Sequence, residues 1–591
     1  MVGPGAAGAP EGGGDAVTIP TAGGDTRTAA SLPAQLRAGP GATESPGVSD
    51  RRLARAALLT AVLSAVGSIL GLGRDQSLAR LFGAGSETDA FLVAWTVPEF
   101  AATLLIEDGL AFVLVPAFSA ALARRAQARG TDPVRSLVAS SLPRFGLAFL
   151  AAAVLLIAGA PFLVHVLAPG LPDPRLAVDC TRLTATCVLT FGLTGYCSAA
   201  LRAHGCYLPP AAIYVAYNTG IIATMLVGGT RWGVRSAAMG VAVGGCLMVA
   251  VQLPAFQRQL RAAKAAEKLA GEARGEARDE AGDEPGDKPG DEPGGEVAAK
   301  GRRAMHLGLI AAVLAFALCK QSQVFIERFL ASSLAAGSIS HLNYAQKVAQ
   351  LPMSFSLMLC TVTFPVVAQA MARGDVAAAR ARIERDLGLA ACVVLVGAAA
   401  IFACAPQIIH VLFQRGAFTA ADTAATASVM RVYALGLLGH SMVGALVRSY
   451  FSSGRPTWYP VGAMAVGMAA TAGVGSWTVD LWGVRGIAGA NAFGITLTAV
   501  LLLAAMDRRS VPVDISKVLA ELGKPLLAAA GATVAGLMAA ASFASPLAAG
   551  GAGCLAVTAV FVVLLWALRA ESLAPLVPVV RSATRKLRHA R

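Results

Sequence analysis

The sequence predicts an all-α polytopic membrane protein with about 14 transmembrane helices, in two six-helix lobes that are parallel repeats, plus two C-terminal helices. Three observations lead to this fold class. Of the 591 residues, 55% are hydrophobic and only 14% are charged, which is too apolar for a soluble globular protein. Apolar runs recur at the length of about 20 residues that a bilayer demands. Similar segments also return in the same order in the second half of the chain.

The basic charge and the cysteines do not point to a soluble function. A net charge of +14 would suggest nucleic acid only if the basic residues clustered on one folded face, but they lie in short loops between apolar runs. We therefore expect no nucleic-acid partner. Most of the 10 cysteines sit within or beside apolar runs without metal-ligand spacing, so they are interpreted as small buried residues.

The first half starts with residues 1–50, a tail rich in Gly, Ala, Pro, Ser and Thr. It lacks an apolar run, which predicts a disordered cytoplasmic tail, and it lacks the basic start and apolar core of a signal peptide. Six spans are expected within the first lobe, residues 51–256. They lie near 56–73, 88–119, 140–168, 181–203, 211–229 and 234–255.

The second half starts after residues 257–304, a charged low-complexity segment that is expected to be a flexible cytoplasmic linker. The second lobe occupies 305–507, two extra spans lie within 508–570, and a basic cytoplasmic tail follows at 571–591. The spans are expected near 307–332, 343–370, 386–412, 424–452, 460–480, 485–506, 525–545 and 550–569.

Loop charges predict the orientation of the spans, because cytoplasmic loops carry an excess of Lys and Arg. With a cytoplasmic N-terminus, every even-numbered loop should be basic, and each holds such residues, for example Arg124 with Arg125 and Arg380 with Arg382. The odd-numbered loops hold isolated charges such as Arg175. Both termini are therefore expected in the cytoplasm.

An internal repeat relates the two halves at a nearly constant shift. The segment APFLVHVLAPG, for example, resembles APQIIHVLFQRG. Six spans per unit return the chain to the same side, so the units are parallel, and two such bundles around a central cavity form a transporter architecture. The two aligned histidines lie at corresponding helix ends, which favours a packing or interfacial role. The aligned pairs include Pro161 with Pro406, His165 with His410, and Arg202 with Arg448.

Charged side chains concentrate in the stretch from Leu70 to Pro116. Charge at membrane depth is costly and usually marks a transport pathway. Pro98 should break the second span near its middle, which lipid tolerates only where the freed backbone groups meet protein or water. The stretch therefore predicts the wall of a polar cavity. Its candidate residues are Arg74, Asp75, Arg80, Asp89, Glu107 and Asp108.

The second half offers further charged candidates opposite this stretch. Lys320 and Lys347 are expected to face the same cavity, whereas Glu327 and Arg328 are interpreted as a structural pair near a span end. No Walker A loop, GxSxG elbow or HExxH motif occurs, so we expect neither an enzyme nor a cofactor or metal. Work against a gradient would come from ion coupling or the membrane potential.

Several segments resemble the MurJ/MviN family of the multidrug/oligosaccharidyl-lipid/polysaccharide exporter superfamily. They include LFGAGSETDAFLVAW, GSISHLNYAQKVAQLP and LFQRGAFTAADT, and the resemblance extends from Arg51 to about Met506. The family's fold implies two lobes around a cationic cavity, with two extra C-terminal helices that help form a groove for a lipid tail.

The chain departs from the family pattern where the family typically carries arginines. Ser68 precedes the first motif, and Ala102 and Thr103 replace an arginine pair after the proline of the second span. Arg74 is retained, and Lys347 keeps a positive charge without the planar fork that grips a phosphate with two hydrogen bonds. Losing these arginines removes charge-assisted hydrogen bonds from a diphosphate site.

The resemblance implies a flippase that moves an undecaprenyl-diphosphate-linked peptidoglycan precursor, lipid II, across the bacterial plasma membrane by alternating access. One alternative is a flippase for another polyprenyl-linked glycan, such as an exopolysaccharide precursor. Another is a non-transporting scaffold that recruits cell-wall synthesis proteins through residues 257–304. The expected substrate-binding residues are Arg74, Lys347, Arg80 and Lys320, and the expected gating or coupling residues are Asp75, Asp89, Glu107 and Asp108.

Overall fold

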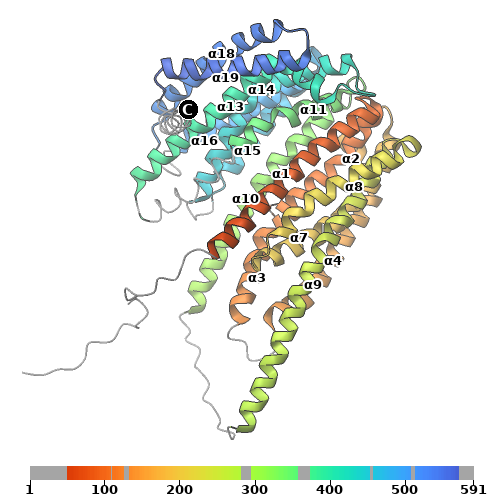
Figure 1. Cartoon of the computed structure of the whole chain (residues 1–591), viewed down its shortest axis with the longest axis vertical. Helices are drawn as coiled ribbons and strands as arrows, with labels where there is room; N and C mark the ends of the chain where they lie inside the picture. Colours follow the sequence, from red (N-terminus) through yellow and green to blue (C-terminus); the bar gives the residue numbers. More distant parts are fainter. Residues whose placement is uncertain are drawn as a thin grey trace, which may run out of the picture. The chain divides into compact units, whose positions relative to one another are not determined.

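The computed structural model consists of helices and short connections throughout the part of the chain that it describes (Figure 1). The described residues are 49–107, 109–125, 132–280, 295–356, 373, 375–452, 457–506 and 513–570. Within these ranges, 12 helices are long and apolar enough to cross a membrane. The all-α membrane fold expected from the sequence is confirmed.

The first lobe runs from α1 to α9. Its elements are α1 (Ser49–Phe82), α2 (Ser86–Ala102), the π-helix η1 (Thr103–Glu107), α3 (Gly109–Arg125), α4 (Pro133–Ala158), α5 (Ala160–Leu167), α6 (Pro174–Ala185), α7 (Cys187–Ala203), α8 (Leu208–Trp232) and α9 (Arg235–Glu280). Local sequence signals set several of these boundaries. Asp132 and Asp173 cap α4 and α6 by accepting hydrogen bonds from backbone N–H groups of the first turn. A proline follows each of these caps at the first helical position, where its missing N–H has no cost.

The second lobe runs from α10 to α16 and is followed by two extra helices. Its elements are α10 (Gly295–Ala331), α11 (Ser338–Ala349), α13 (Val376–Phe413), α14 (Ala420–Ser452), α15 (Tyr459–Trp482) and α16 (Val484–Ala504), and the extra helices are α18 (Ile515–Ala541) and α19 (Pro546–Ala567). In Figure 1, α18 and α19 lie side by side, and both pack against α13. The described residues from Ala56 onward form one compact unit, and all contacts described below lie within it.

Each predicted span overlaps a described helix, but two of them are not among the 12 spans counted above. The predicted span 460–480 is the 24-residue helix α15, whose many Gly and Thr residues lower its hydropathy. The predicted span 343–370 begins in α11, and its residues beyond 356 lie outside the described ranges.

The segment 257–304 includes helical residues at both of its ends. Helix α9 continues to Glu280, and α10 already begins at Gly295. The residues of the α9 extension are mostly Ala, Glu, Lys and Arg, which all have high helix propensity. The segment is therefore helical on both sides of residues 281–294, which lie outside the described ranges, and its role as a flexible cytoplasmic linker stays a prediction.

The two lobes repeat the same backbone features, as the sequence alignment predicts. Before the first aligned proline, Gly159 separates α4 from α5, and before the second, Cys404 leaves helical geometry inside α13. Proline clashes with the preceding turn of a helix, so both breaks have the same cause. The turns α8–α9 and α15–α16 each contain a glycine with φ near +55°, Gly233 and Gly483, a conformation that other residues rarely adopt.

An apolar core is shared by both lobes at one end. It includes Val93 and Val97 of α2 together with Leu342 and Tyr344 of α11 and Phe413 of α13. Two further cores lie elsewhere, one in the second lobe with α18 and α19 and one among α3, α4, α7 and α9 of the first lobe. The lobes are thus packed together where α2 meets α11.

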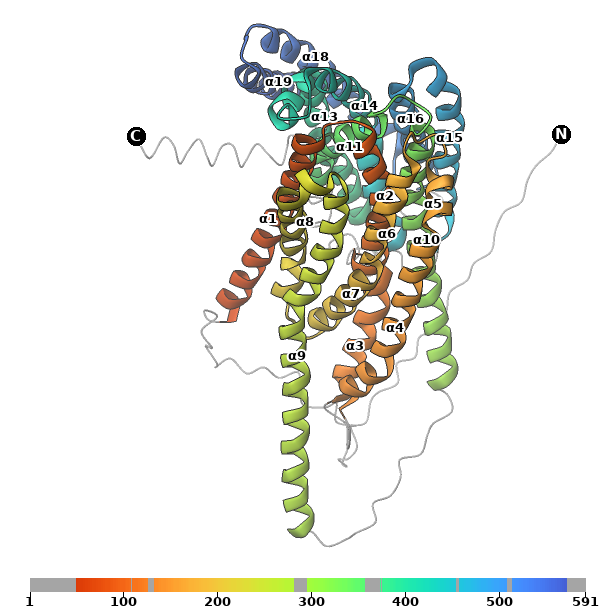
Figure 2. The ribbon, with the colours of Figure 1, turned by 90° about the vertical axis from the view of Figure 1, so that its right-hand side faces the viewer.

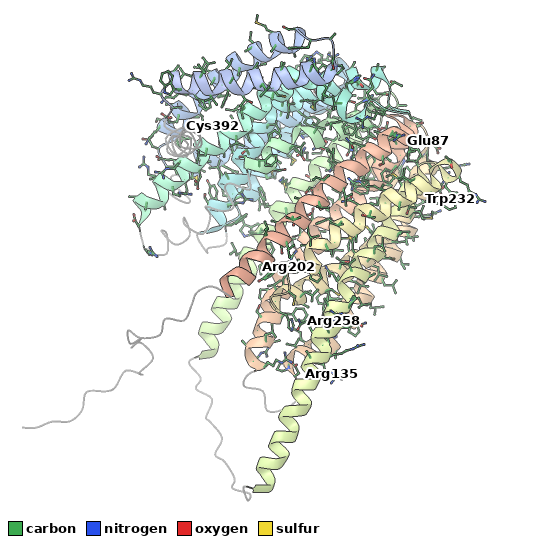
Figure 3. All side chains as sticks on the ribbon, viewed as in Figure 1. Glu87, Arg135, Arg202, Trp232, Arg258 and Cys392 are labelled. Atoms are coloured by element: carbon green, nitrogen blue, oxygen red, sulfur yellow. The ribbon has the colours of Figure 1, made fainter. Side chains whose placement is uncertain are left out.

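We call this region the latch end, and it contains the loops 83–85, 168–173, 332–337 and 414–419. In Figure 2, α2, α5, α6 and α10 are grouped near it, in agreement with their contacts. Figure 3 places Glu87 and Trp232 at this end of the first lobe, and Arg135 and Arg258 toward the other end. Large apolar side chains are exposed on the helix surfaces, including Phe162 (74%) and Trp566 (76%), as a lipid-facing surface requires.

Candidate functional site

A cavity of about 340 Å³ lies between the lobes, and most of its wall comes from the charged stretch that the sequence singled out. Elements α1, α2, η1, α7 and α8 of the first lobe and α10 and α11 of the second contribute side chains. The lining residues are Arg74, Trp95, Pro98, Glu99, Ala102, Thr103, Glu107, Phe191, Tyr214, Tyr217, Asn218, Gln321 and Lys347. The predicted polar cavity is therefore present, with residues from both lobes.

Arg74 is fixed on the cavity wall by three neighbours. Its Nε and Nη2 atoms donate to Oδ1 of Asp75 at 3.0 and 2.7 Å, and Nη1 donates to Oδ1 of Asn218 at 3.3 Å. The guanidinium carbon also lies 4.3 Å from the ring centroid of Trp95, a cation–π contact. Arg74 is thus paired with its neighbour in the chain, Asp75. Because several contacts hold the Arg74 side chain, its guanidinium group is fixed at the cavity wall. It does not extend freely toward the membrane–water interface.

Pro98 does not end α2, contrary to our expectation. The helix continues through it to Ala102, and irregular geometry begins afterwards, at η1. Proline has no N–H to donate to the carbonyl of Ala94, and the hydroxyl of Thr184 on α6 donates to that oxygen instead, at 3.1 Å. A neighbouring helix thus supplies the missing hydrogen bond and keeps α2 straight enough to continue.

The π-helix η1 positions Glu107. Its wider backbone turn lies between α2 and α3, and such turns are frequent at functional sites. The hydroxyl of Tyr214 on α8 donates to Oε1 of Glu107 at 2.8 Å, so this carboxylate faces the cavity with a neutral partner. Asp108, its predicted companion, lies outside the described residues.

Lys347 and Glu99 form an ion pair across the two lobes, which we call the cavity tie. Nζ of Lys347 on α11 lies 3.4 Å from Oε1 of Glu99 on α2, and both side chains are partly exposed, at 32% and 25%. Beside it, the rings of Phe100 and Phe325 stack with centroids 4.7 Å apart. Glu99 was missed by the sequence reasoning, although its position directly after Pro98 on the same apolar span was a usable signal.

Asp89 joins the lobes at the latch end. Its Oδ2 accepts a hydrogen bond from the Gly337 N–H at 2.7 Å, and its Oδ1 accepts from the N–H and the hydroxyl of Ser340 at 2.7 and 2.6 Å. Asp89 is only 3% exposed. These donors lie at the N-terminus of α11, where the helix dipole favours a negative charge. We call this group of contacts the latch, and the gating role of Asp89 stays a prediction.

Two predicted substrate ligands are not brought to the cavity. Arg80 and Lys320 are both exposed, and neither is among the lining residues. Arg80 instead contributes its backbone, because its carbonyl oxygen accepts a hydrogen bond from the Ala417 N–H at 2.9 Å at the latch end. The position of a residue within an apolar run gives its depth along the span, but it does not give the face of the helix on which the side chain lies. The direction of these two side chains was therefore not predictable.

Glu327 and Arg328 of the second lobe do not form the structural pair that we expected. Glu327 and Arg328 are 2% and 3% exposed. Instead of pairing with each other, Glu327 accepts from Asn491 Nδ2 at 2.6 Å and from Gln323 Nε2 at 3.0 Å, and Arg328 donates to Asn343 Oδ1 at 3.4 Å. Consecutive residues on a helix point in different directions, which separates the two charges.

The charge of the cavity differs from the cationic site implied by the family resemblance. Among the described residues that line the cavity, the basic ones are Arg74 and Lys347 and the acidic ones are Glu99 and Glu107, so the formal charges of this described lining cancel. Ala102 and Thr103, at the positions of the lost arginine pair, line the cavity and add no charge. Within the described residues, no group of three or more His, Cys, Asp or Glu side chains could hold a metal ion.

Comparisons with known proteins agree with this architecture. The family model described as lipid II flippase MurJ matches residues 78–552. A Burkholderia cenocepacia protein named lipid II flippase MurJ is 26% identical over 467 residues, which cover 78% of this chain and 84% of that protein.

Among solved structures, a lipid II flippase MurJ in an inward closed conformation is similar with a TM-score of 0.67 and 18% identity, over 88% of this chain and all of that one. An inward-facing multidrug resistance MATE family transporter has a TM-score of 0.56 and 15% identity, over 78% of this chain and 99% of that one. At these identities the two structures support the fold alone.

Proposed function

Because the chain belongs to the lipid II flippase MurJ family, we propose that it moves lipid II from the inner to the outer leaflet of the bacterial plasma membrane. The main support for the proposal is the cavity, because Arg74 of the first lobe and Lys347 of the second lobe both line it. A diphosphate between them would receive charge-assisted hydrogen bonds from both lobes.

The proposed orientation puts the N-terminus in the cytoplasm and the latch end outside. The bases at the other end support it, because Arg135 and Arg258 lie there in Figure 3 and short cytoplasmic loops are enriched in Lys and Arg. With the latch closed and the shared core intact, this arrangement corresponds to a state that is sealed toward the outside.

We propose that substrate binding and the latch act in sequence. The diphosphate competes with Glu99 for Lys347, which breaks the cavity tie. Release of Asp89 from Gly337 and Ser340 then lets the latch end open. Glu107, held by Tyr214, is proposed to help switch the cavity between its two states, and Asp108 shares this role. The apolar helices α18 and α19 would guide the prenyl tail.

The test is complementation in a bacterium depleted of its own lipid II flippase, with the exposure of lipid II outside the cell measured in the same cultures. Rescue with lipid II appearing outside supports the proposal. Failure, with the protein shown to be inserted at normal abundance, contradicts it.

A second candidate, transport of another polyprenyl-linked glycan, is favoured by one observation. Ala102 and Thr103 line the cavity where the family resemblance implies an arginine pair. A failed complementation combined with export of a different lipid-linked glycan would support it. The proposed contact of cell-wall synthesis proteins with residues 257–304 is separable from both, since deleting that segment should leave transport largely intact.

A further inference from the structure

A second groove, of about 620 Å³, lies on the first lobe near the latch end, away from the cavity between the lobes. It is formed by α5, α6 and the start of α9. Its polar lining includes His165, Arg175, Asp179, Arg182 and Arg235, and its apolar lining includes Pro161, Val164 and Val178. We call it the arginine groove.

Helix α6 presents three of these residues on one face. Arg175, Asp179 and Arg182 are spaced by four and three residues, so they lie above one another on the helix. The opposite face is buried, with Leu176, Cys180 and other residues in the core. Over these seven residues the helix rises about 10 Å, so Arg175 and Arg182 lie about two turns apart along α6.

The groove carries excess positive charge. Asp179 is engaged by Arg235, whose Nε and Nη2 atoms donate to its Oδ2 at 3.1 and 2.8 Å. Within the described residues, neither Arg175 nor Arg182 has a hydrogen bond or an ion pair, and both are exposed. Three arginines and one carboxylate therefore line the groove, and Asp173, which is not among the lining residues, caps the first turn of α6. Two of the three arginines are available to a ligand.

The fold does not require these arginines. The shift that aligns Arg202 with Arg448 places Ala421 and Ser428 at the positions of Arg175 and Arg182. The second lobe thus builds the equivalent helix without either charge. In the proposed orientation, the cluster also lies at the outer end, where loops are normally poor in Lys and Arg. The second lobe has bases of its own at this end, Arg415 and Arg485, but none at the positions of Arg175 and Arg182. These two arginines are therefore not part of the repeat, which indicates a binding function rather than a structural one.

The surroundings of the groove identify the class of ligand. Phe162 (74% exposed) lies on the groove-forming α5, and Leu155 (72% exposed) lies near the end of the preceding α4, so the basic groove adjoins apolar, lipid-facing helix surface. A ligand that satisfies both needs an anionic head at the arginines and an apolar body along the helices. A free inorganic anion would use only the first of these features.

We propose that the arginine groove binds the phosphate headgroup of an anionic phospholipid in the leaflet around the latch end. Arg175 and Arg182 donate hydrogen bonds to the phosphate oxygens, while Arg235 remains bound to Asp179 in the groove wall. The acyl chains run along the exposed face of α4 and α5. This site is separate from the cavity between the lobes. Lipid binding there can therefore be tested independently of the proposed transport function.

The experiment uses the purified full-length protein in a non-ionic detergent and measures bound lipid by native mass spectrometry. Dioleoylphosphatidylglycerol is titrated against the wild type and against the double variant Arg175→Gln/Arg182→Gln, with dioleoylphosphatidylcholine as the zwitterionic lipid. Arg231→Gln is the matched control, because Arg231 is an exposed arginine near the same end that does not line the groove.

We expect the double variant to bind phosphatidylglycerol at least about tenfold more weakly, with Arg231→Gln unchanged, because two charge-assisted contacts are lost. Arg182→Lys, which keeps the charge, should stay within about threefold of the wild type. Equal affinity in the double variant, or an equal loss in Arg231→Gln, would overturn the proposal. Displacement of the lipid by millimolar inorganic phosphate would assign the groove to a free anion instead.

Discussion

Two of the polar contacts between the lobes, the latch and the cavity tie, differ in burial although both join α2 to α11. The latch buries Asp89 almost completely and holds it with hydrogen bonds of 2.6–2.7 Å. The cavity tie between Lys347 and Glu99 is longer, at 3.4 Å, and a quarter to a third of each side chain is exposed. Buried charge-assisted hydrogen bonds contribute far more than exposed ion pairs. We therefore expect the latch to hold the closed state and the tie to be weak enough for a substrate to replace.

The largest expected effect is on the latch. Asp89→Ala leaves the N–H groups of Gly337 and Ser340 without their acceptor, which should cost the closed state roughly 3 kcal/mol. Spin labels on cysteines at the exposed positions Glu87 and Ala336 should show a longer distance across the latch end. Asp89→Asn keeps one acceptor oxygen and should move the distance less. Unchanged distances in Asp89→Ala would show that the shared apolar core alone holds this end.

Next in size is the loss of the fixed cavity cation. Arg74→Ala should lower transport by at least about tenfold, because the charge-assisted contacts to a diphosphate are lost. Membrane abundance should not change. Arg74→Lys keeps the charge but not the planar fork and should be intermediate. Transport at wild-type level in Arg74→Ala would remove Arg74 from the proposed site.

The cavity tie can be tested with a matched pair of variants. Glu99→Gln and Lys347→Gln break the same ion pair, whose own contribution is at most about 1 kcal/mol. If Lys347 binds substrate, Lys347→Gln should lower transport about tenfold, while Glu99→Gln stays within about threefold of the wild type. Equal effects in the two variants would mean that the pair serves only to hold the lobes together. The readout is extracellular lipid II in complemented cells.

The smallest expected effect concerns the stretch of α2 between the two contacts. Thr184→Val removes the hydroxyl that donates to the Ala94 carbonyl left free by Pro98, at a cost of about 1 kcal/mol in unfolding free energy. Thr184→Ser retains the donor and should be close to the wild type. A thermal unfolding series in detergent measures both, and equal stability of the two variants would show that Ala94 needs no donor.

Sequence reasoning was most successful where a pattern depends on local physics. Span positions follow from apolar run length, whereas the one helix break predicted from a proline, at Pro98, is wrong. It was less successful at assigning direction and burial. Arg80 and Lys320 were expected in the cavity but are exposed elsewhere, and Glu99 was overlooked although it pairs with Lys347.

The sequence by itself determined the membrane class, the span positions, the repeat and the stretch that forms the cavity wall. These features depend on composition and on residues close together in the sequence, and both can be read from the amino-acid sequence alone. Tertiary structure alone decided that Asp89 caps α11, that Glu99 meets Lys347, and that Arg175 and Arg182 face a groove. Each of these depends on the rotation of one helix against another, which is fixed by packing between residues far apart in the sequence.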